Sequence, residues 1–418
     1  MSVRVRYIYS ACVAFETEDL KILCDPWMSE GAYDGSWYHY PLLENPLDAA
    51  GQADLIYVSH IHPDHYDPKF LKTYLKKYPK TKIIIAPFGQ NYLSKRMRFD
   101  GIPHEVVSKY SVGGTKIWLI PNERDWFDVD SALVVKHKGH TVVNMNDNVY
   151  NQDQIERIKK IAPSVQVALL AYAGAGPYPQ TYYEIGPELL LKAAEKKKNF
   201  FMRYKQMRDA LLPEISIPFA GKYILGGRLF YLNPYRGVSD PVEVLAFDKN
   251  AVVLEDGGQA WIDTKNLQPN SVRTALYDVK DMEAFALRLS QRPMDYEFEA
   301  NDFNMSAIAI QELCQKAYEN AVQKSSYQKD YWFSVWLQDR WFVMNCNASK
   351  PFYYIAANVL NVFPRTEIHL DLRYLCGLLT RKYHWSIAEI GSQLMMRRIP
   401  DIYDEEAQNF LNFFHKKS

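Results

Sequence analysis

The strongest constraint on this chain is a cluster of metal-ligand side chains within seven residues, Ser59-His-Ile-His-Pro-Asp-His65. The cluster directly follows the apolar segment 54–58, which is typical of a buried strand. On an extended segment, side chains two residues apart point the same way, so His60 and His62 can bind one ion. The aspartate and the last histidine follow a turn at the proline and can bind a second ion. The pattern predicts a dinuclear site at the end of a strand.

The ligand types narrow the choice of metal. Imidazole nitrogen and carboxylate oxygen suit iron or zinc, whereas magnesium and calcium take mostly oxygen ligands. The alternative is a set of surface histidines beside an aspartate that caps a helix. Three histidines and one aspartate directly after a buried strand argue against that alternative. We therefore predict His60, His62, Asp64 and His65 as metal ligands.

Strand and helix patterns alternate through the first half of the chain. A helical pattern at 153–161 precedes an apolar strand pattern at 165–172, and a longer charged helix is expected at 185–212. Strands are expected again at 242–247 and 251–254. This alternation predicts a layered α/β domain.

Helical periodicity dominates from residue 282, so we place a domain boundary near residue 290. The expected domains are a metal domain at 1–290 and a smaller α+β domain at 291–418. A chain of 418 residues, 48% of them hydrophobic, is long enough for two such cores.

Composition limits the partners and the compartment. Lysine plus arginine equals aspartate plus glutamate at 49 each, which removes the bulk electrostatic argument for nucleic acid. The five cysteines form no Cys-x-x-Cys pair, as expected of free thiols in the cytoplasm. No apolar run approaches the roughly 18 residues that a membrane span needs. The start of the chain alternates like a strand and does not resemble a signal peptide.

The first cluster matches the HxHxDH signature of the metallo-β-lactamase superfamily, which implies an αββα sandwich. Leu23-Cys-Asp25-Pro-Trp27 resembles the early strand-end aspartate, which in the family supports the metal loop without binding metal. Asn144-Met-Asn-Asp147-Asn resembles the later turn in which a family aspartate bridges both ions, although Asn146 replaces the usual glycine. Asp147 is therefore a predicted ligand. The alternative for Asp147 is an Asx turn between a strand and a helix.

Hydrolases of this superfamily place another histidine at a strand end before the bridging aspartate. Here the corresponding strand, 116–120, ends in Pro121-Asn-Glu123-Arg. We therefore predict Glu123 as the third ligand of the first ion; the alternative is a surface glutamate paired with the next arginine. The histidines of Lys136-His-Lys-Gly-His140 come too close to Asp147 and are expected at a hairpin tip in water.

The loop after 165–172 also departs from the hydrolase pattern, because Ala173-Gly-Ala-Gly-Pro-Tyr178-Pro-Gln-Thr-Tyr182 replaces the last histidine. Glycines let a ligand approach the backbone, and tyrosines donate hydrogen bonds. We predict Tyr172 and Tyr178 beside the reacting substrate. The alternative is a plain turn.

These departures favour oxygen chemistry. A glutamate in place of a neutral histidine adds negative charge, which stabilises higher-valent iron. The diiron oxygenases that β-hydroxylate carrier-bound amino acids in antibiotic biosynthesis resemble this site because they carry glutamate there. A longer resemblance, to CMP-N-acetylneuraminate hydroxylases, rests on Gly35-Ser-Trp-Tyr, 174–179, Pro218-Phe-Ala-Gly and 385–404. We expect a non-haem diiron monooxygenase that uses O2 to hydroxylate a C–H or N–H bond of a small biosynthetic substrate derived from a sugar, nucleotide-sugar or amino acid.

The CMP-N-acetylneuraminate hydroxylases carry a Rieske domain, which needs a Cys-x-His and a Cys-x-x-His pair. This sequence has neither pair, so we expect electrons from a separate donor such as ferredoxin and its reductase. The region from Tyr331 onward resembles a sterol-carrier-type module. Its histidines, His369, His384 and His415, are expected to be packed or exposed and not to bind the metal.

Two other classes remain open. The same ligands suit a dinuclear zinc or manganese hydrolase acting on a phosphoester, lactone or amide, as most bearers of this signature are hydrolases. The third class is a metal-stabilised binding protein without catalysis, since the missing last histidine would weaken the second site. Metal stoichiometry separates the two enzyme classes from the third.

Overall fold

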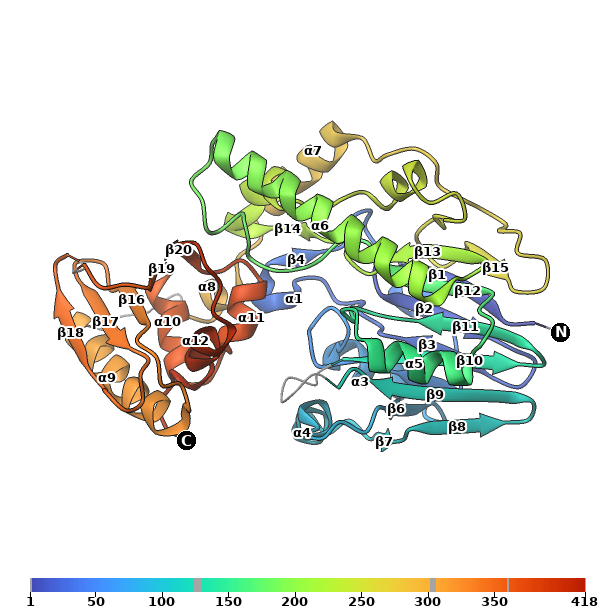
Figure 1. The fold of residues 1–418 in the computed structure, drawn as a ribbon, viewed down its shortest axis with the longest axis horizontal. Coiled ribbons are helices and arrows are strands. Elements are labelled where there is room, and N and C mark those ends of the chain that lie inside the picture. The colour runs from blue at the N-terminus through green and yellow to red at the C-terminus, as the bar shows by residue number, and fades with distance from the viewer. Residues whose placement is uncertain (1, 124–129, 301–305, 359–360, 418) are drawn as a thin grey trace.

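The computed structural model describes residues 2–123, 130–300, 306–358 and 361–417, and its first part is a sandwich of two sheets between helices (Figure 1). The first sheet has the order β15–β1–β2–β3–β5–β6–β7 and the second has the order β13–β12–β11–β10–β9–β8. The strands of the first sheet are β1 (Arg4–Tyr9), β2 (Cys12–Glu16), β3 (Lys21–Cys24), β5 (Leu55–Tyr57), β6 (Lys82–Ile85), β7 (Glu105–Val106) and β15 (Trp261–Asp263). Those of the second are β8 (Lys109–Val112), β9 (Thr115–Pro121), β10 (Ser131–His137), β11 (His140–Asn144), β12 (Val167–Ala171) and β13 (Ile215–Phe219).

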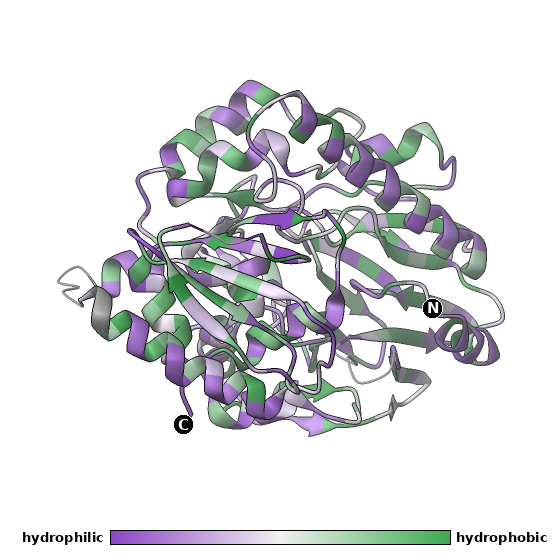
Figure 2. Ribbon diagram, turned by 60° about the vertical axis from the view of Figure 1, so that its left-hand side comes forward, coloured by the Kyte–Doolittle hydropathy of each residue, from purple (hydrophilic) through white to green (hydrophobic). Residues whose placement is uncertain are grey.

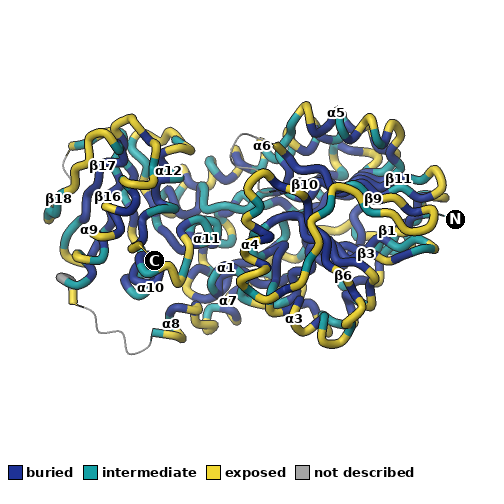
Figure 3. Tube along the Cα trace, turned by 90° about the horizontal axis from the view of Figure 1, so that it is seen from below, coloured by how far each residue is buried: buried dark blue, intermediate teal, exposed yellow. Residues whose placement is uncertain are grey.

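Apolar side chains fill the space between the two sheets. Val13 and Ile22 of the first sheet lie in one buried cluster with Leu133 and Val167 of the second. Helices α3 (Pro68–Lys77) and α4 (Tyr92–Phe99) pack on the outer face of the first sheet, and α5 (Gln152–Ile161) and α6 (Pro187–Leu211) on that of the second. The strands are mostly apolar and buried, while the helices turn polar, exposed residues outward (Figures 2 and 3). The predicted αββα sandwich is confirmed.

The predicted helices at 153–161 and 185–212 are present as α5 and α6. The strand predicted at 242–247 is wrong, because this segment is a 3-10 helix, η2 (Pro241–Ala246). The Asp240 side chain accepts a hydrogen bond from the Val242 backbone, and the Glu243 side chain accepts one from the Asp240 backbone. This reciprocal capping turns the chain into a helix despite its β-branched residues. Two isolated bridges, Ser216 to Ala251 and Leu254 to Val272, stand in place of the strand expected at 251–254.

Several short elements connect the sandwich to the C-terminal part. They are α1 (Ala32–Gly35), β4 (Trp37–Tyr38), α2 (Pro46–Ala50), β14 (Ile224–Leu225), η1 (Gly227–Tyr235), α7 (Val279–Leu289) and α8 (Asp295–Glu299). Strands β4 and β14 pair with each other. The turn at α1 contacts α11 (Trp385–Ile390) of the C-terminal part, so it joins the two halves of the molecule.

The C-terminal part is a mixed sheet with helices against it (Figure 1). Its strand order is β18–β17–β16–β19–β20, with β16 and β19 parallel. The elements are α9 (Ala307–Lys324), β16 (Trp332–Trp336), β17 (Trp341–Asn345), β18 (Tyr353–Ala356), β19 (Arg365–His369), α10 (Leu372–Leu379), α11 (Trp385–Ile390), β20 (Met395–Ile399), α12 (Glu405–Phe410) and η3 (Leu411–Phe413). The expected second region of strands and helices is confirmed. Its boundary near residue 290 and its likeness to a sterol carrier stay predictions.

The lengths and hydropathy of the helices can be compared with the prediction that no segment spans a membrane. Among the residues that the structure describes, no helix is both long enough and apolar enough to cross a bilayer. The five cysteines are buried as free thiols.

Candidate metal centre

The candidate ligands gather where neighbouring strands end. β3 leads into Asp25, β5 leads into the loop that carries His60 and His65, and β11 leads into Asp147. β3 and β5 run parallel, so their carboxyl ends meet at the same edge of the first sheet. The two sheets of the sandwich thus bring segments from distant parts of the sequence to one point.

Asp25 holds the histidine loop in place. It is fully buried; its Oδ1 accepts a hydrogen bond from the Ser59 backbone at 2.7 Å, and its Oδ2 lies 3.0 Å from Nδ1 of His65. A carboxylate on one ring nitrogen directs the other nitrogen, Nε2, toward a metal. Asp25 therefore supports the loop, as the resemblance implied.

Nε2 of His65 is buried and has no hydrogen-bond partner among the described residues. Oδ2 of Asp64 lies 3.5 Å away and Oδ2 of Asp147 lies 3.4 Å away, spacings that fit ligand atoms about 2.1 Å from a shared ion. Burial would lower the pKa of His65, but the carboxylates of Asp64, Asp147 and Asp25 outweigh it and raise that pKa well above its usual value. The site thus favours positive charge, which a metal ion would supply.

His60 and His62 form the other half of the cluster. Nε2 of His60 lies 2.8 Å from Nδ1 of His62. Burial, together with the nearby charge of His65, lowers the pKa of His62 to about 4 and that of His60 well below its usual value. Both rings are therefore neutral near pH 7 and offer nitrogen lone pairs. Ligand atoms of His60, His65 and Asp147 all lie within 4.8 Å of one another, so Asp147 is placed to reach both halves.

The conformation of the turn that carries Asp147 explains why Asn146 can stand where the family has glycine. Asn146 has a φ of 47°, in the left-handed region that favours glycine and that asparagine tolerates. The Asn146 side chain donates a hydrogen bond to the Ser131 carbonyl at 2.7 Å, which ties the turn to β10. Asparagine can therefore replace the family's glycine here.

Glu123 does not lie where the sequence argument placed it. Its side chain is 64% exposed and its Oε2 lies 3.2 Å from Arg157 on α5, away from the histidines. Asn151 at the start of α5 donates a hydrogen bond to the Glu123 carbonyl at 3.0 Å. The chain has left the strand end and turned toward α5, so the carboxylate points outward. Arg124, the partner considered for Glu123, lies outside the described residues.

Asp130, which sequence reasoning did not single out, lies beside His60 instead. It directly precedes β10, is buried, and its Oδ1 lies 3.5 Å from Nδ1 of His60. Its Oδ2 is buried without a hydrogen-bond partner among the described residues. Burial, reinforced by the charge of Asp147, raises the pKa of Asp130 well above its usual value. Such a carboxylate is costly to bury unless a cation binds it.

Sequence reasoning missed Asp130 because it looked for a ligand after β9, not before the next strand. The pairing of Ser131 with Pro121 across β9 and β10 brings Asp130 to the metal edge. The hairpin pattern could have identified Asp130. In an antiparallel hairpin, the residue just before the second strand lies opposite the residue just after the first strand.

The two predicted tyrosines also lie elsewhere. Tyr172 is buried in the cluster between the second sheet and α6, whereas its neighbours Ala171 and Ala173 line the metal cavity. Alternate residues of an extended segment point to opposite faces, so Tyr172 points away. The Tyr178 hydroxyl lies 3.4 Å from Asp401 and does not line the metal cavity.

Another tyrosine contacts the cluster instead. The Tyr33 hydroxyl donates a hydrogen bond to Oδ1 of Asp64 at 2.5 Å, and both side chains are buried. The C-terminal part supports this contact, because a Cβ on Gly391 would lie 2.9 Å from Cβ of Tyr33. The glycine therefore lets the end of α11 pack closely on the turn that carries Tyr33.

We expect Tyr33→Phe to weaken metal binding about 10- to 100-fold, because Asp64 would lose the partner that orients it. Competition with a coloured chelator measures the affinity. Tyr327→Phe is the matched control, since Tyr327 donates a similar bond, of 2.8 Å, to Asp404 in the C-terminal part. Equal affinities in the two variants would contradict the role of Tyr33.

The cluster opens into a cavity of about 510 Å³. One wall is the glycine loop at 173–176, and Phe200 and Arg203 of α6 lie beside it. A Cβ on Gly174 would lie 1.9 Å from the Phe200 ring, so glycine is needed for α6 to pack there. The C-terminal part closes the cavity with Ile390, Glu405 and Glu406.

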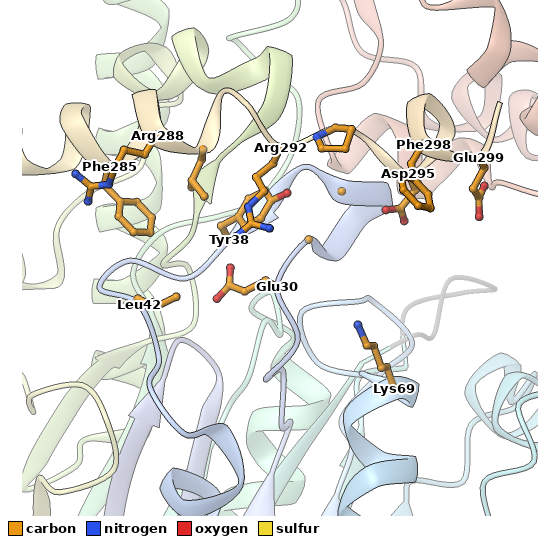
Figure 4. Close-up of a pocket in the computed structure, with 14 residues that line it drawn as sticks. Glu30, Tyr38, Leu42, Lys69, Phe285, Arg288, Arg292, Asp295, Phe298 and Glu299 are labelled. Carbon is orange, nitrogen blue, oxygen red and sulfur yellow. The ribbon is translucent and has the colours of Figure 1, made fainter. Parts of the chain in front are cut away.

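A second cavity, of about 710 Å³, lies on the other side of the turn at α1 (Figure 4). Arg288, Arg292 and Lys69 line it together with aromatic side chains. None of the candidate ligands lines it, so the smaller cavity is the one at the metal cluster.

The layered sandwich with a His/Asp cluster at its strand ends defines the metallo-β-lactamase fold. Residues 4–165 match the model of the β-lactamase superfamily domain. This part of the chain is therefore a domain of the β-lactamase superfamily.

Curated relatives extend the likeness. The "Putative Rieske 2Fe-2S iron-sulfur protein" of Mycolicibacterium smegmatis is 30% identical over 303 residues, which cover 68% of this chain and 57% of the relative. The cytidine monophosphate-N-acetylneuraminic acid hydroxylase of Danio rerio is 26% identical over 244 residues, which cover 53% of this chain and 38% of the relative. The matched region thus spans only about half, or less, of these relatives.

Solved structures give a weaker likeness. CmlA, a diiron β-hydroxylase from Streptomyces venezuelae, is 16% identical with a TM-score of 0.38, covering 69% of this chain and 50% of CmlA. Igni18, a metallo hydrolase from Ignicoccus hospitalis, is 18% identical with a TM-score of 0.39, covering 62% of this chain and 97% of Igni18. Scores this low support no argument about function.

Proposed function

We propose that this protein is a non-haem diiron monooxygenase that hydroxylates a C–H or N–H bond of a small biosynthetic substrate. The observation that carries the proposal is Asp130, a buried carboxylate whose Oδ1 lies 3.5 Å from Nδ1 of His60 and whose Oδ2 has no hydrogen-bond partner among the described residues. With Asp64 and Asp147 it gives the cluster three carboxylates. Carboxylate-rich sites stabilise iron in higher oxidation states, which oxygen activation requires. A relative named as a hydroxylase supports the same reading.

In this proposal His60, His62 and Asp130 would hold one ion, Asp64 and His65 would hold the other, and Asp147 would serve both. Bound as two ferrous ions, the metal would supply two electrons, which with two protons reduce one oxygen atom of O2 to water while the other enters the substrate. Asp25 and Tyr33 keep His65 and Asp64 oriented through their hydrogen bonds.

The cavity walls would bind and orient the substrate. The Arg203 guanidinium lies over the Phe200 ring at 5.0 Å and offers a cation to an anionic group. Glu405 and Glu406 line the same cavity and offer negative charge to a cationic or hydroxyl group. Ile390 and the glycine loop help to exclude water from the reacting bond.

The sequence given has no Rieske ligand pairs, whereas a relative is named a Rieske iron-sulfur protein. We therefore propose that electrons come from an iron–sulfur protein outside this sequence, such as a ferredoxin served by its reductase. The substrate is proposed only as a class, derived from a sugar, nucleotide-sugar or amino acid.

Metal content tests the proposal directly. We expect protein purified without oxygen from iron-supplemented cells to hold two irons per chain, with an absorption spectrum that changes on exposure to air. Two zinc ions that persist under iron supplementation, with no response to air, would replace the proposal by the hydrolase alternative. Phosphoesters and lactones would then be screened. One ion or none per chain would favour a binding protein without catalysis.

The hydrolase alternative has one observation in its favour. His60 and His62 are neutral imidazoles, which zinc also prefers. Such a site would act on a phosphoester, lactone or amide.

A further inference from the structure

A second cluster of metal-ligand side chains lies at the opposite end of the sandwich from the candidate metal centre. The tip between β10 and β11 carries His137 and His140, and the turn between β2 and β3 carries Glu18 and Asp19. Ligand atoms of Glu18, Asp19 and His137 lie within 4.8 Å of one another. This hairpin tip lies on the side of the sandwich away from the C-terminal part (Figure 1). At about 3.3 Å per residue, the length of β10 separates His137 from Asp130 by about 23 Å.

The structure corrects the expectation that both histidines of this tip lie in water. His137 is fully buried, because it continues the face of β10 on which Leu133 and Val135 fill the core between the sheets. His140 is its register partner on β11 and therefore lies on the same face. The tip thus turns two imidazoles inward, toward the β2–β3 turn of the other sheet.

Hydrogen bonds determine which nitrogen of His137 is free. The Thr115 hydroxyl donates to Oδ2 of Asp19 at 2.8 Å, so its oxygen accepts from Nδ1 of His137, also at 2.8 Å. Oδ2 of Asp19 lies 3.3 Å from the same Nδ1. Nδ1 is therefore the donor in this contact, and Nε2 is the nitrogen that faces away from Thr115 and Asp19. A carboxylate and a hydroxyl behind one nitrogen orient the other for metal binding.

The Nε2 atom of His137 is buried and has no hydrogen-bond partner among the described residues. Oε1 of Glu18 lies 3.5 Å away, too far for a good hydrogen bond but close to the spacing of two ligands about 2.1 Å from a tetrahedral zinc. Nδ1 of His140 is likewise buried and unpartnered in the described part of the chain. Nε2 of His137 and the Glu18 carboxylate are donors of the kind that zinc takes, and His140, the register partner of His137, offers a further buried imidazole nitrogen on the same face.

We infer that His137 and Glu18, with His140 beside them, bind a zinc-type divalent cation that ties the two sheets together at this end. Asp19 and Thr115 are positioning residues, since they act through Nδ1 of His137. The ammonium of Lys138 contacts Glu18 as a competing cation that the metal ion would displace, and its side chain is 49% exposed. The site is independent of the proposed oxygenase chemistry.

The test counts zinc on the full chain. Chelator-treated protein is dialysed against buffered zinc chloride and its metal content is measured by mass spectrometry. We expect His137→Gln and Glu18→Gln to bind one zinc ion fewer per chain than the parent. His104→Gln is the matched control and should bind as many as the parent, because both ring nitrogens of His104 already have partners.

Two further measurements keep the test decisive if buried His137 cannot be replaced without unfolding. Glu18 lies in a partly exposed turn, so Glu18→Gln should fold and lower zinc affinity at this site at least tenfold. Lys138→Ala should raise that affinity, because it removes the competing cation. Equal zinc counts in the parent and Glu18→Gln, or no response to Lys138→Ala, would overturn the inference. The oxygenase proposal would survive that result, since the ligands at the strand ends are untouched.

Discussion

Asp130→Asn is expected to remove one of the two metal ions of the strand-end cluster, and substrate hydroxylation with it. Asparagine keeps the size of the side chain but replaces the carboxylate beside His60, including its unpartnered Oδ2, with a neutral amide. Metal content after anaerobic loading with ferrous iron measures the loss. Glu123→Gln is the matched control and should keep both ions, because Glu123 pairs with Arg157 at the surface.

A stability measurement separates a ligand from a structural residue at this position. Burial raises the pKa of Asp130 well above its usual value, so the carboxylate charge is unfavourable without a cation. We therefore expect Asp130→Asn to leave the metal-free protein at least as stable as the parent, while the stabilisation by metal falls. Loss of metal from Glu123→Gln but not from Asp130→Asn would restore the original assignment.

Trp37→Ala is expected to lower the free energy of unfolding by about 3–5 kcal/mol, the usual range for truncating a large buried aromatic side chain. Trp37 is 1% exposed and stacks on Tyr223 with ring centroids 3.5 Å apart. It also packs on Tyr33, with ring centroids 4.3 Å apart. Because Tyr33 orients Asp64, metal affinity should fall together with stability. Denaturant unfolding of the metal-free protein measures the first effect.

Phe99→Ala is the control for Trp37→Ala. Phe99 is also aromatic, but it is 85% exposed at the end of α4. Its truncation should change the free energy of unfolding by no more than about 0.5 kcal/mol. A loss below about 1 kcal/mol in Trp37→Ala would mean that the cavity collapses without penalty and that the turn at α1 does not depend on this packing.

The C-terminal part contributes to the site as well as to the core. Ile390, Glu405 and Glu406 line the metal cavity, and the Tyr374 hydroxyl donates to Asp34 at 2.5 Å beside the turn that carries Tyr33. Residues more than three hundred positions apart thus shape one cavity. Substrate selection in the proposed oxygenase would therefore depend on both parts of the chain.

Local sequence determined the features that depend on neighbouring residues. The strand pattern at 54–58 and the ligands that follow it fixed the position of His60, His62, Asp64 and His65, because a buried strand must end where polar residues begin. The role of Asp25 and the turn at Asp147 also followed from short motifs at strand ends. The αββα sandwich followed from the family signature and from the alternation of strands and helices.

Tertiary structure alone decided the remaining contacts of the candidate site. Glu123 and Asp130 flank the same hairpin, and only the register of β9 with β10 brings Asp130 to the histidines and directs Glu123 to α5. Tyr172 faces away because its neighbours on alternate positions face the cavity, while Tyr33 reaches Asp64 across a turn held by the C-terminal part. The pairing register of the strands and the packing between distant segments set these positions, and neither can be predicted from the local order of residues.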